Sequence, residues 1–166
     1  MWLLGPVRAV SAHLEEVELP EGPTDAAFVL DLRHSSGVVS FVSSTKLYHL
    51  DERELRAYGS DGSYTARSTD VQAAAIAAGR RPAENRAAWG YEHPERWGVL
   101  RTADGAQPAP SQQGAYFEFY EQFARACTGE GPAPSPGQEG VAVLAVLDAA
   151  RRSAGTRQWE DVPPAG

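Results

Sequence analysis

The chain has 166 residues, of which 42% are hydrophobic, and 22 acidic against 15 basic residues give it a net charge of −7. This composition is typical of one globular domain with an apolar core, and the acidic balance excludes nucleic acid and anionic membranes as partners, because both require a basic surface. No run of about 18 apolar residues is present, so we predict no membrane span. A single cysteine, Cys127, argues against a disulfide framework and indicates a reducing, cytoplasmic compartment.

The first residues are typical of the end of a helix. Met1 to Leu4 is apolar, and Gly5-Pro6 then stops the pattern. No capping residue precedes it, which suggests that the helix began in residues that this chain lacks. A secretory signal peptide would need a basic start and a longer apolar run. Met1 as a native start and a plain ragged terminus stay open as alternatives.

The next segment alternates apolar and polar residues with the period of a β-strand. The first strand is predicted at Val7 to Leu19, and a change of phase between Leu14 and Val17 predicts a bulge. One face of the second strand carries Phe28, Leu30 and Leu32.

Further strands are predicted at 38–48, 53–58 and 63–67. Turn residues at 34–37 and at 59–62 join them. Links this short allow antiparallel neighbours only, because a parallel neighbour needs a crossover of about a dozen residues or more.

An Ala-rich helix follows the strands. Thr69 and Gln72 have the spacing of a capping box, and Gly79 marks the end of this helix. Residues 80–98 are irregular, and 98–102 has the pattern of one more short strand.

Two longer helices complete the chain. Ser111 is the predicted cap of the first, which ends at 129–132 and has one apolar face with Tyr116, Phe119, Tyr120, Phe123 and Cys127. Ser135 is the predicted cap of the second, which ends at Gly155. Its apolar positions are Val143, Val146, Leu147 and Ala150.

Strands followed by helices predict an α+β fold, with an open, mostly antiparallel sheet and helices packed on one face. We expect a single domain over residues 1–160 and a frayed, Pro-rich tail over 161–166. The other face of the sheet is partly apolar, which makes it a candidate surface for self-association.

The sequence contains none of the common short motifs for catalysis, phosphate binding or metal binding. There is no Gly-rich phosphate-binding loop, no GxSxG and no HExxH. The four histidines have no metal-ligand spacing, and Cys127 on an apolar helix face is expected to be a core residue rather than a nucleophile. The residues therefore show no complete catalytic site and no metal site.

Six short motifs occur in an order that is informative as a set. They are Trp2-Leu3-Leu4-Gly5-Pro6-Val7, Tyr58-Gly59-x-x-Gly62-Ser63, Trp89-Gly90, Gly98-Val99-Leu100, Gly114-x-Tyr116-x-x-Phe119-Tyr120 and Ala149-Ala150-Arg151-x-Ser153-Ala154. Together they resemble the C-terminal domain of the Gfo/Idh/MocA oxidoreductases over about residues 2 to 160.

The resemblance implies an α+β domain that completes a substrate site and commonly mediates oligomerisation. It also implies an N-terminal Rossmann domain, absent from this chain, that binds NAD or NADP and carries the catalytic Lys of an E-K-P motif and the Asp and His of a D-x-x-x-H motif. We therefore expect no catalytic or cofactor-binding residue here, in a parent that is a sugar- or polyol-type oxidoreductase. The alternative is a stand-alone binding or oligomerisation module, which the absence of a Rossmann-coding stretch upstream would favour.

The resemblance also points to substrate contacts. Tyr48 and His49 lie where the strand that begins at Val38 ends, a place that often faces the nicotinamide pocket in that family, and each offers a polar tip for a hydroxyl group. Trp89 and Trp97 are further candidates as an apolar wall. A Tyr packed on a helix and a solvated His stay open as the alternative.

Overall fold

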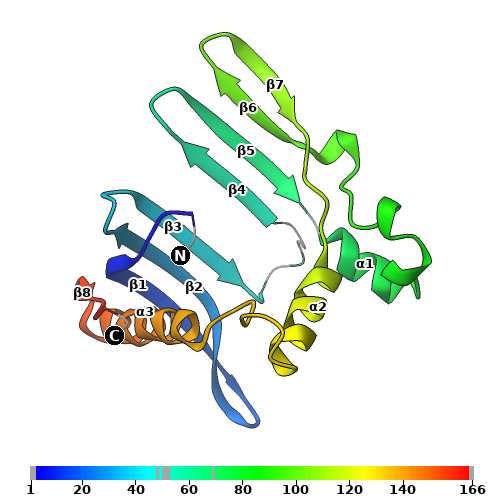
Figure 1. Ribbon diagram of the computed structural model, residues 1–166. Coiled ribbons are helices and arrows are strands. Elements are labelled where there is room, and N and C mark those ends of the chain that lie inside the picture. Colours follow the sequence, from blue (N-terminus) through cyan, green and yellow to red (C-terminus); the bar gives the residue numbers. More distant parts are fainter. Residues whose placement is uncertain (1–2, 48, 50–52, 69, 165–166) are drawn as a thin grey trace. The chain divides into compact units, whose positions relative to one another are not determined.

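The computed structural model describes residues 3–47, 49, 53–68 and 70–164. These residues form two compact units: unit 1 comprises Met1–His49 with Ser135–Gly166, and unit 2 comprises Leu50–Pro134. Each unit contains a four-stranded sheet (Figure 1). The α+β class and the open antiparallel arrangement are confirmed, but the strands are divided between two sheets, because alternation alone does not say which strands pair.

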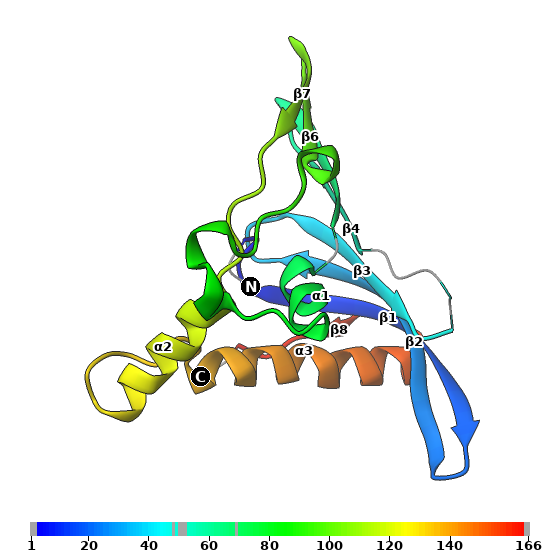
Figure 2. The same cartoon turned by 90° about the vertical axis from the view of Figure 1, so that its right-hand side faces the viewer.

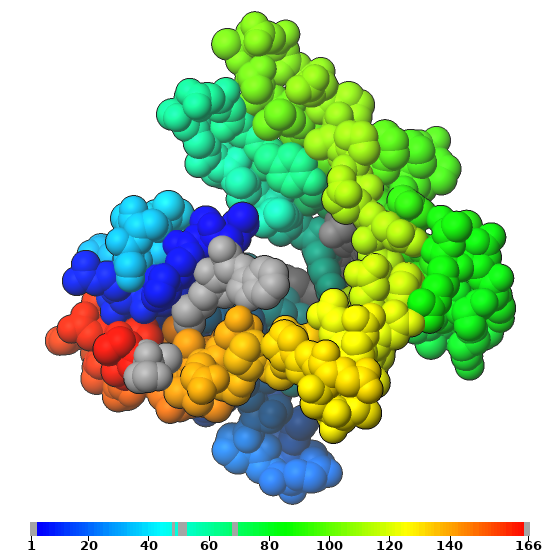
Figure 3. Space-filling model, viewed as in Figure 1, coloured from blue at the N-terminus to red at the C-terminus, as the bar shows by residue number. Residues whose placement is uncertain are grey.

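The sheet of unit 1 has the order β3-β2-β1-β8. Its elements are β1 (Val7–Leu19), β2 (Gly22–His34), β3 (Val39–Thr45), α3 (Gly137–Thr156) and β8 (Glu160–Asp161). The predicted bulge is confirmed by a shift of the β1–β2 register between Glu15 and Glu16. Beyond the bulge, the β1–β2 hairpin extends past the end of α3 (Figure 2). In the space-filling view its tip protrudes below the rest of unit 1 (Figure 3).

The core of unit 1 lies between α3 and one face of this sheet (Figure 2). Val10 of β1 and Ala149 of α3 are both 0% exposed, and small side chains on the helix allow this close approach. The buried cluster is Val7, Val10, Leu30, Leu32, Val146, Ala149 and Ala150. A helix on one face of the sheet is therefore confirmed for unit 1.

Two predicted core residues of α3 are only partly covered. Val143 is 49% exposed and Leu147 is 41% exposed, whereas Ala149 and Ser153 are buried. The buried positions 146, 149, 150 and 153 follow the spacing of three and four residues that places side chains on one helix face. The sequence pattern thus predicted the helix correctly but placed the centre of its buried face at the wrong residues.

The ends of α3 also differ from the prediction. The N-cap is Pro136, without a side-chain hydrogen bond, rather than Ser135. At the other end the helix continues through Gly155 to Thr156, and Arg157 takes the left-handed conformation with φ 59°. The Arg157 N–H donates to the Ser153 carbonyl, so Arg157 ends the helix in the conformation that glycine usually supplies.

The first residues of the expected frayed tail are part of the sheet. Asp161 pairs with Ala9 in the β1–β8 ladder. The Val162 N–H donates to the Arg8 carbonyl at 2.8 Å, and its side chain packs against the core. The prediction of a tail that frays from residue 161 is therefore wrong for these two residues.

The sheet of unit 2 has the order β4-β5-β6-β7 (Figure 1). The strands are β4 (Arg53–Tyr58), β5 (Gly62–Ser68), β6 (Gly98–Thr102) and β7 (Gly105–Ala109). Short helical turns occupy Pro82–Glu84, Arg86–Ala88 and Pro94–Arg96. Strand β7 was not predicted, because its sequence has no β-branched residue and contains Pro108, which only an edge strand tolerates.

The helices of unit 2 are α1 (Val71–Ala77) and α2 (Tyr116–Cys127). The N-cap of α1 is Asp70, and that of α2 is Ala115 rather than the predicted Ser111. The apolar face of α2 has no buried residue, and Cys127 is exposed. The prediction that Cys127 is a core residue is therefore wrong.

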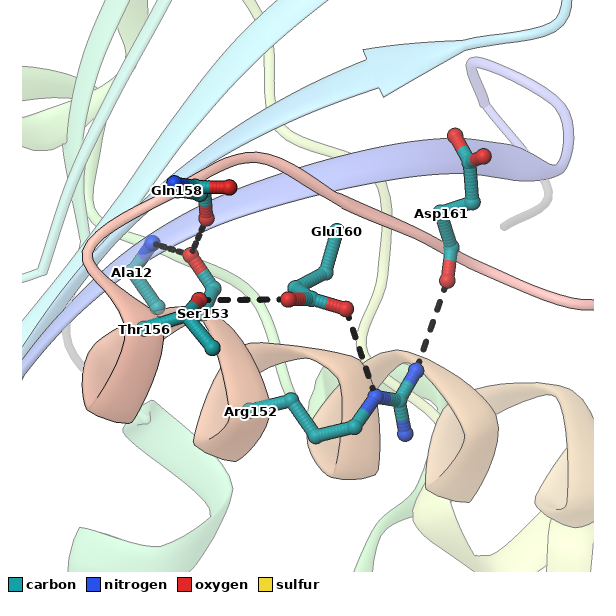
Figure 4. A network of polar contacts seen from close by, with 7 residues as sticks. All are labelled: Ala12, Arg152, Ser153, Thr156, Gln158, Glu160 and Asp161. Atoms are coloured by element: carbon teal, nitrogen blue, oxygen red, sulfur yellow. Dashed lines mark hydrogen bonds and ion pairs between the residues drawn. The ribbon is translucent and has the colours of Figure 1, made fainter.

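The Ser153 hydroxyl joins α3, β1 and the segment that leads to β8 (Figure 4). It accepts a hydrogen bond from the Ala12 N–H at 3.0 Å and donates one to the Gln158 carbonyl. Ser153 is 1% exposed. Because β8 pairs with β1 only at Ala9 and Val10, the hydroxyl takes over as the acceptor for Ala12 beyond the end of that short strand.

Replacing Ser153 by Ala should lower the free energy of unfolding by about 1–3 kcal/mol, because it leaves a buried donor and a buried acceptor unpaired. Urea unfolding followed by circular dichroism measures the change. Ser44→Ala, an exposed strand position of the same unit, is the control and should change stability by less than about 0.5 kcal/mol. Equal stability of Ser153→Ala and the unmodified chain would contradict this assignment.

Candidate functional site

Trp97 lines a groove of about 550 Å³ that belongs to unit 2. Pairing of β4 with β5 places Glu54 opposite Arg67 and Arg56 opposite Thr65. Because alternate residues of a strand point to one face, these side chains share a face of the sheet. The other lining residues are Tyr58, Ala66, Glu95, Arg96, Val99 and Arg101.

One carboxylate in the groove holds two arginines. Glu54 accepts two hydrogen bonds from Arg56 Nη2, at 3.0 and 2.9 Å, and lies 3.6 Å from Arg67 Nε. The hydrogen bond from Arg56 lowers the pKa of Glu54 and, in turn, raises the pKa of Arg56. Arg101 Nη1 donates to the Thr65 hydroxyl at 3.0 Å. The groove therefore carries more positive than negative charge.

The Trp97 ring is held at the edge of this groove. Its indole N–H donates to the Glu92 carbonyl at 3.2 Å, and Arg96 Nε lies 3.6 Å from the Glu92 carboxylate. Trp97 is half-buried. An aromatic ring fixed in this way offers a flat apolar surface to a ligand.

Trp89 occupies a different place in unit 2 and is 7% exposed. Its indole N–H donates to Gln72 Oε1 at 3.1 Å, and the same oxygen accepts the Tyr116 N–H at 3.0 Å. Gln72 is 5% exposed. Its predicted capping-box partner Thr69 lies outside the described residues. Trp89 is an anchor that ties α1 to the start of α2 through Gln72.

Two glycines permit this packing. The Gly114 N–H donates to the Gly90 carbonyl at 2.8 Å. A Cβ atom on Gly90 would clash with the Gly114 carbonyl oxygen, and the φ of Gly90 is +75°. A side chain at Gly90 would therefore displace the backbone that leads into α2.

The predicted pair at the end of the third strand is only partly described. Tyr48 lies outside the described residues. His49 follows β3 in a bend and is exposed. His49 belongs to unit 1 and both tryptophans to unit 2, where Trp89 and Trp97 occupy separate places. The arginines of the groove were missed because only the strand register brings them together.

The start of α1 does not suit a pyrophosphate group. At the start of α1, the Asp70 carboxylate already accepts the N–H groups of Gln72 and Ala73, and its charge would repel a phosphate. No Gly-rich turn joins a strand to a helix in the described ranges. Across the same residues, no group of three His, Cys, Asp or Glu side chains could hold a metal ion, and no helix is long and apolar enough to cross a membrane.

Comparison with known proteins identifies the family. The family model described as the oxidoreductase family, C-terminal alpha/beta domain, matches residues 1–162. The chain therefore belongs to the Gfo/Idh/MocA oxidoreductases and contains their C-terminal domain, as the sequence motifs predicted. No protein with a curated description matches the sequence.

Solved structures have the same fold. The oxidoreductase yvaA of Bacillus subtilis is 24% identical, with a TM-score of 0.84, and the match covers 98% of this chain and 48% of that one. An oxidoreductase of Bacteroides fragilis is 27% identical, with a TM-score of 0.80 and coverage of 96% and 48%. Levoglucosan dehydrogenase, in a complex with NADH and L-sorbose, is 18% identical, with a TM-score of 0.65 and coverage of 98% and 46%. The chain spans about half the length of these relatives.

A pH-dependent contact links α1 to α2. The Tyr116 hydroxyl donates to Asp70 Oδ2 at 2.6 Å. This hydrogen bond lowers the pKa of Asp70 below its ordinary 3.8 and raises that of Tyr116 above its ordinary 10.0. The stability from Asp70 is therefore lost as pH falls through its lowered folded-state pKa, and that from Tyr116 is lost as pH rises through its raised one.

Replacing Tyr116 by Phe should lower the free energy of unfolding between about pH 5 and pH 9, where the contact is intact. The difference from the unmodified chain should shrink below pH 3.8 and above pH 10.0, as Asp70 takes up or Tyr116 loses its proton. Urea unfolding over this pH range measures it. Tyr120→Phe, which alters an exposed tyrosine of the same helix, should show no such profile. A difference for Tyr116→Phe that does not vary with pH would refute the contact.

Proposed function

We propose that this chain is the substrate-side, C-terminal half of an NAD(P)-dependent oxidoreductase that acts on a sugar or polyol, and that it is not catalytic alone. The observation that carries the proposal is the family match over residues 1–162. The complex of levoglucosan dehydrogenase with NADH and L-sorbose supports this class of cofactor and substrate. Another part of the parent protein supplies the Rossmann domain and the catalytic residues. The single cysteine supports a cytoplasmic location.

Within this proposal, His49 of unit 1 keeps its predicted role as a hydroxyl-binding residue, and Trp97 of unit 2 keeps its predicted role as an apolar wall. His49 is exposed and has ring nitrogens free to bind a hydroxyl group, and Trp97 keeps an accessible ring face. Tyr48 keeps its predicted role as a second hydroxyl-binding residue. Trp89 acts indirectly, because it is only 7% exposed and its indole N–H is bound to Gln72.

The parent protein should reduce NAD or NADP in the presence of its polyol, whereas the chain alone should bind neither NADH nor NADPH in a calorimetric titration. Successive strand residues point to opposite faces, so one of Tyr48→Phe and His49→Ala in the parent should lower kcat/KM by more than about threefold, or roughly 0.7 kcal/mol of transition-state binding. A smaller loss in both variants would contradict the assignment. Glu21→Ala, at an exposed turn residue of unit 1, is the control and should have no effect.

Two outcomes would count against the proposal. Micromolar binding of NADH to the chain alone would place a cofactor site in this half. A parent without a Rossmann domain and without turnover would favour the stand-alone binding or oligomerisation module.

We also propose that the chain self-associates through the face of the unit 1 sheet opposite α3. The strand register puts Val29, Val39 and Phe41 on this face, where they are 50%, 50% and 75% exposed. Between them lies Asp31, whose Oδ1 atom is shielded from solvent and accepts no hydrogen bond within the described part of the chain. A symmetric dimer would cover the apolar side chains and could bring a donor to this oxygen.

Light scattering coupled to gel filtration should give a dimer at tens of micromolar, and Phe41→Ser should convert it to a monomer because this change removes the most exposed apolar side chain of the face. Phe123→Ser, which alters an exposed aromatic residue of α2, should leave the dimer intact. A monomeric unmodified chain, or equal loss of the dimer in both variants, would show that this face is not the interface.

A further inference from the structure

We infer that the arginine-lined groove of unit 2 binds a small molecule with a dianionic group, either a phosphate or a dicarboxylate. All lining residues come from unit 2, so the inference concerns that unit by itself. It does not depend on the oxidoreductase activity proposed above.

The charges in the groove leave an excess that matches such a ligand. The groove is lined by four arginines, Arg56, Arg67, Arg96 and Arg101, and by two glutamates, Glu54 and Glu95, which leaves a formal +2. Arg96 also pairs with Glu92, which lies outside the lining. A dianion neutralises this excess.

The positions of the arginines suit one shared anionic group. Arg56 on β4 lies opposite Thr65 on β5, and Arg101 reaches from β6 to the Thr65 hydroxyl. Adjacent strands are about 4.8 Å apart, so the guanidinium groups of Arg56 on β4 and Arg101 on β6, the two neighbours of β5, can reach a single anionic group above Thr65. Each guanidinium has five N–H donors in a planar fork, and neither Glu54 nor Thr65 uses all of them.

The remaining walls define the size and class of the ligand. A groove of about 550 Å³ is within the usual range for small-molecule sites. Trp97 and Val99 give the uncharged part of the ligand an apolar surface. A nucleic acid does not fit this description, because the net charge of −7 would repel a polyanion that extends beyond the groove.

Isothermal titration calorimetry at constant ionic strength tests the inference, with inorganic phosphate in one arm and succinate in the other. At least one probe should bind saturably, and the comparison of arms distinguishes phosphate from dicarboxylate. The double variant Arg56→Gln/Arg101→Gln should bind that probe at least about tenfold more weakly. Arg80→Gln, at an exposed arginine of unit 2 that does not line the groove, should bind within about twofold of the unmodified chain.

A second measurement uses the unmodified chain and does not depend on the folding of a variant. In nitrogen–proton correlation spectra, the successful probe should shift the signals of the Trp97 indole N–H and of the Thr65 and Arg101 amides. Saturable binding of neither probe, shifts confined to other residues, or equal weakening by Arg80→Gln would each overturn the assignment.

Discussion

The packing of α3 against β1 is the interaction on which the rest of unit 1 depends. Val10 and Ala149 are separated by most of the chain, yet both are completely buried in the same core. Ordering such distant segments costs conformational entropy, which this apolar burial must offset. Ser153 adds a hydrogen bond to β1 at the same interface. The chain then returns directly from α3 to the edge of β1, where it pairs as β8. Unit 2 is the continuous segment between the two parts of unit 1.

Unit 2 depends on a polar contact of a different kind. Gln72 offers one buried oxygen to two donors, the Trp89 indole and the Tyr116 backbone. This contact fixes the irregular segment after α1, and the close approach of Gly90 and Gly114 becomes possible beside it. The sheet of this unit has its own network of charges, centred on Glu54 and the arginines around it. Structural residues and candidate binding residues are thus separate in unit 2, and a change in the groove need not disturb the Gln72 contact.

The local pattern of the sequence predicted the secondary-structure elements that depend on neighbouring residues in the chain. The alternation predicted β1 through β6 and the bulge near Glu15, and the ordered motifs identified the family. The local pattern did not predict features that depend on residues far apart in the sequence or on the conformation at a helix end. Arg157 takes a left-handed conformation that no local residue type indicates, and Gln72 turns from the helix end toward Trp89. The arginines of the groove lie on separate strands, so their meeting follows from the register and not from spacing along the chain.

Native-state hydrogen exchange, read out by mass spectrometry, tests most directly whether residues from both ends of the chain form one core. The account predicts that the amides of β1, β2 and α3 are protected together and lose protection in a single step as urea is added, because each requires the others for its burial. Exchange of α3 that precedes that of β1 and β2, with those strands still protected, would contradict the account.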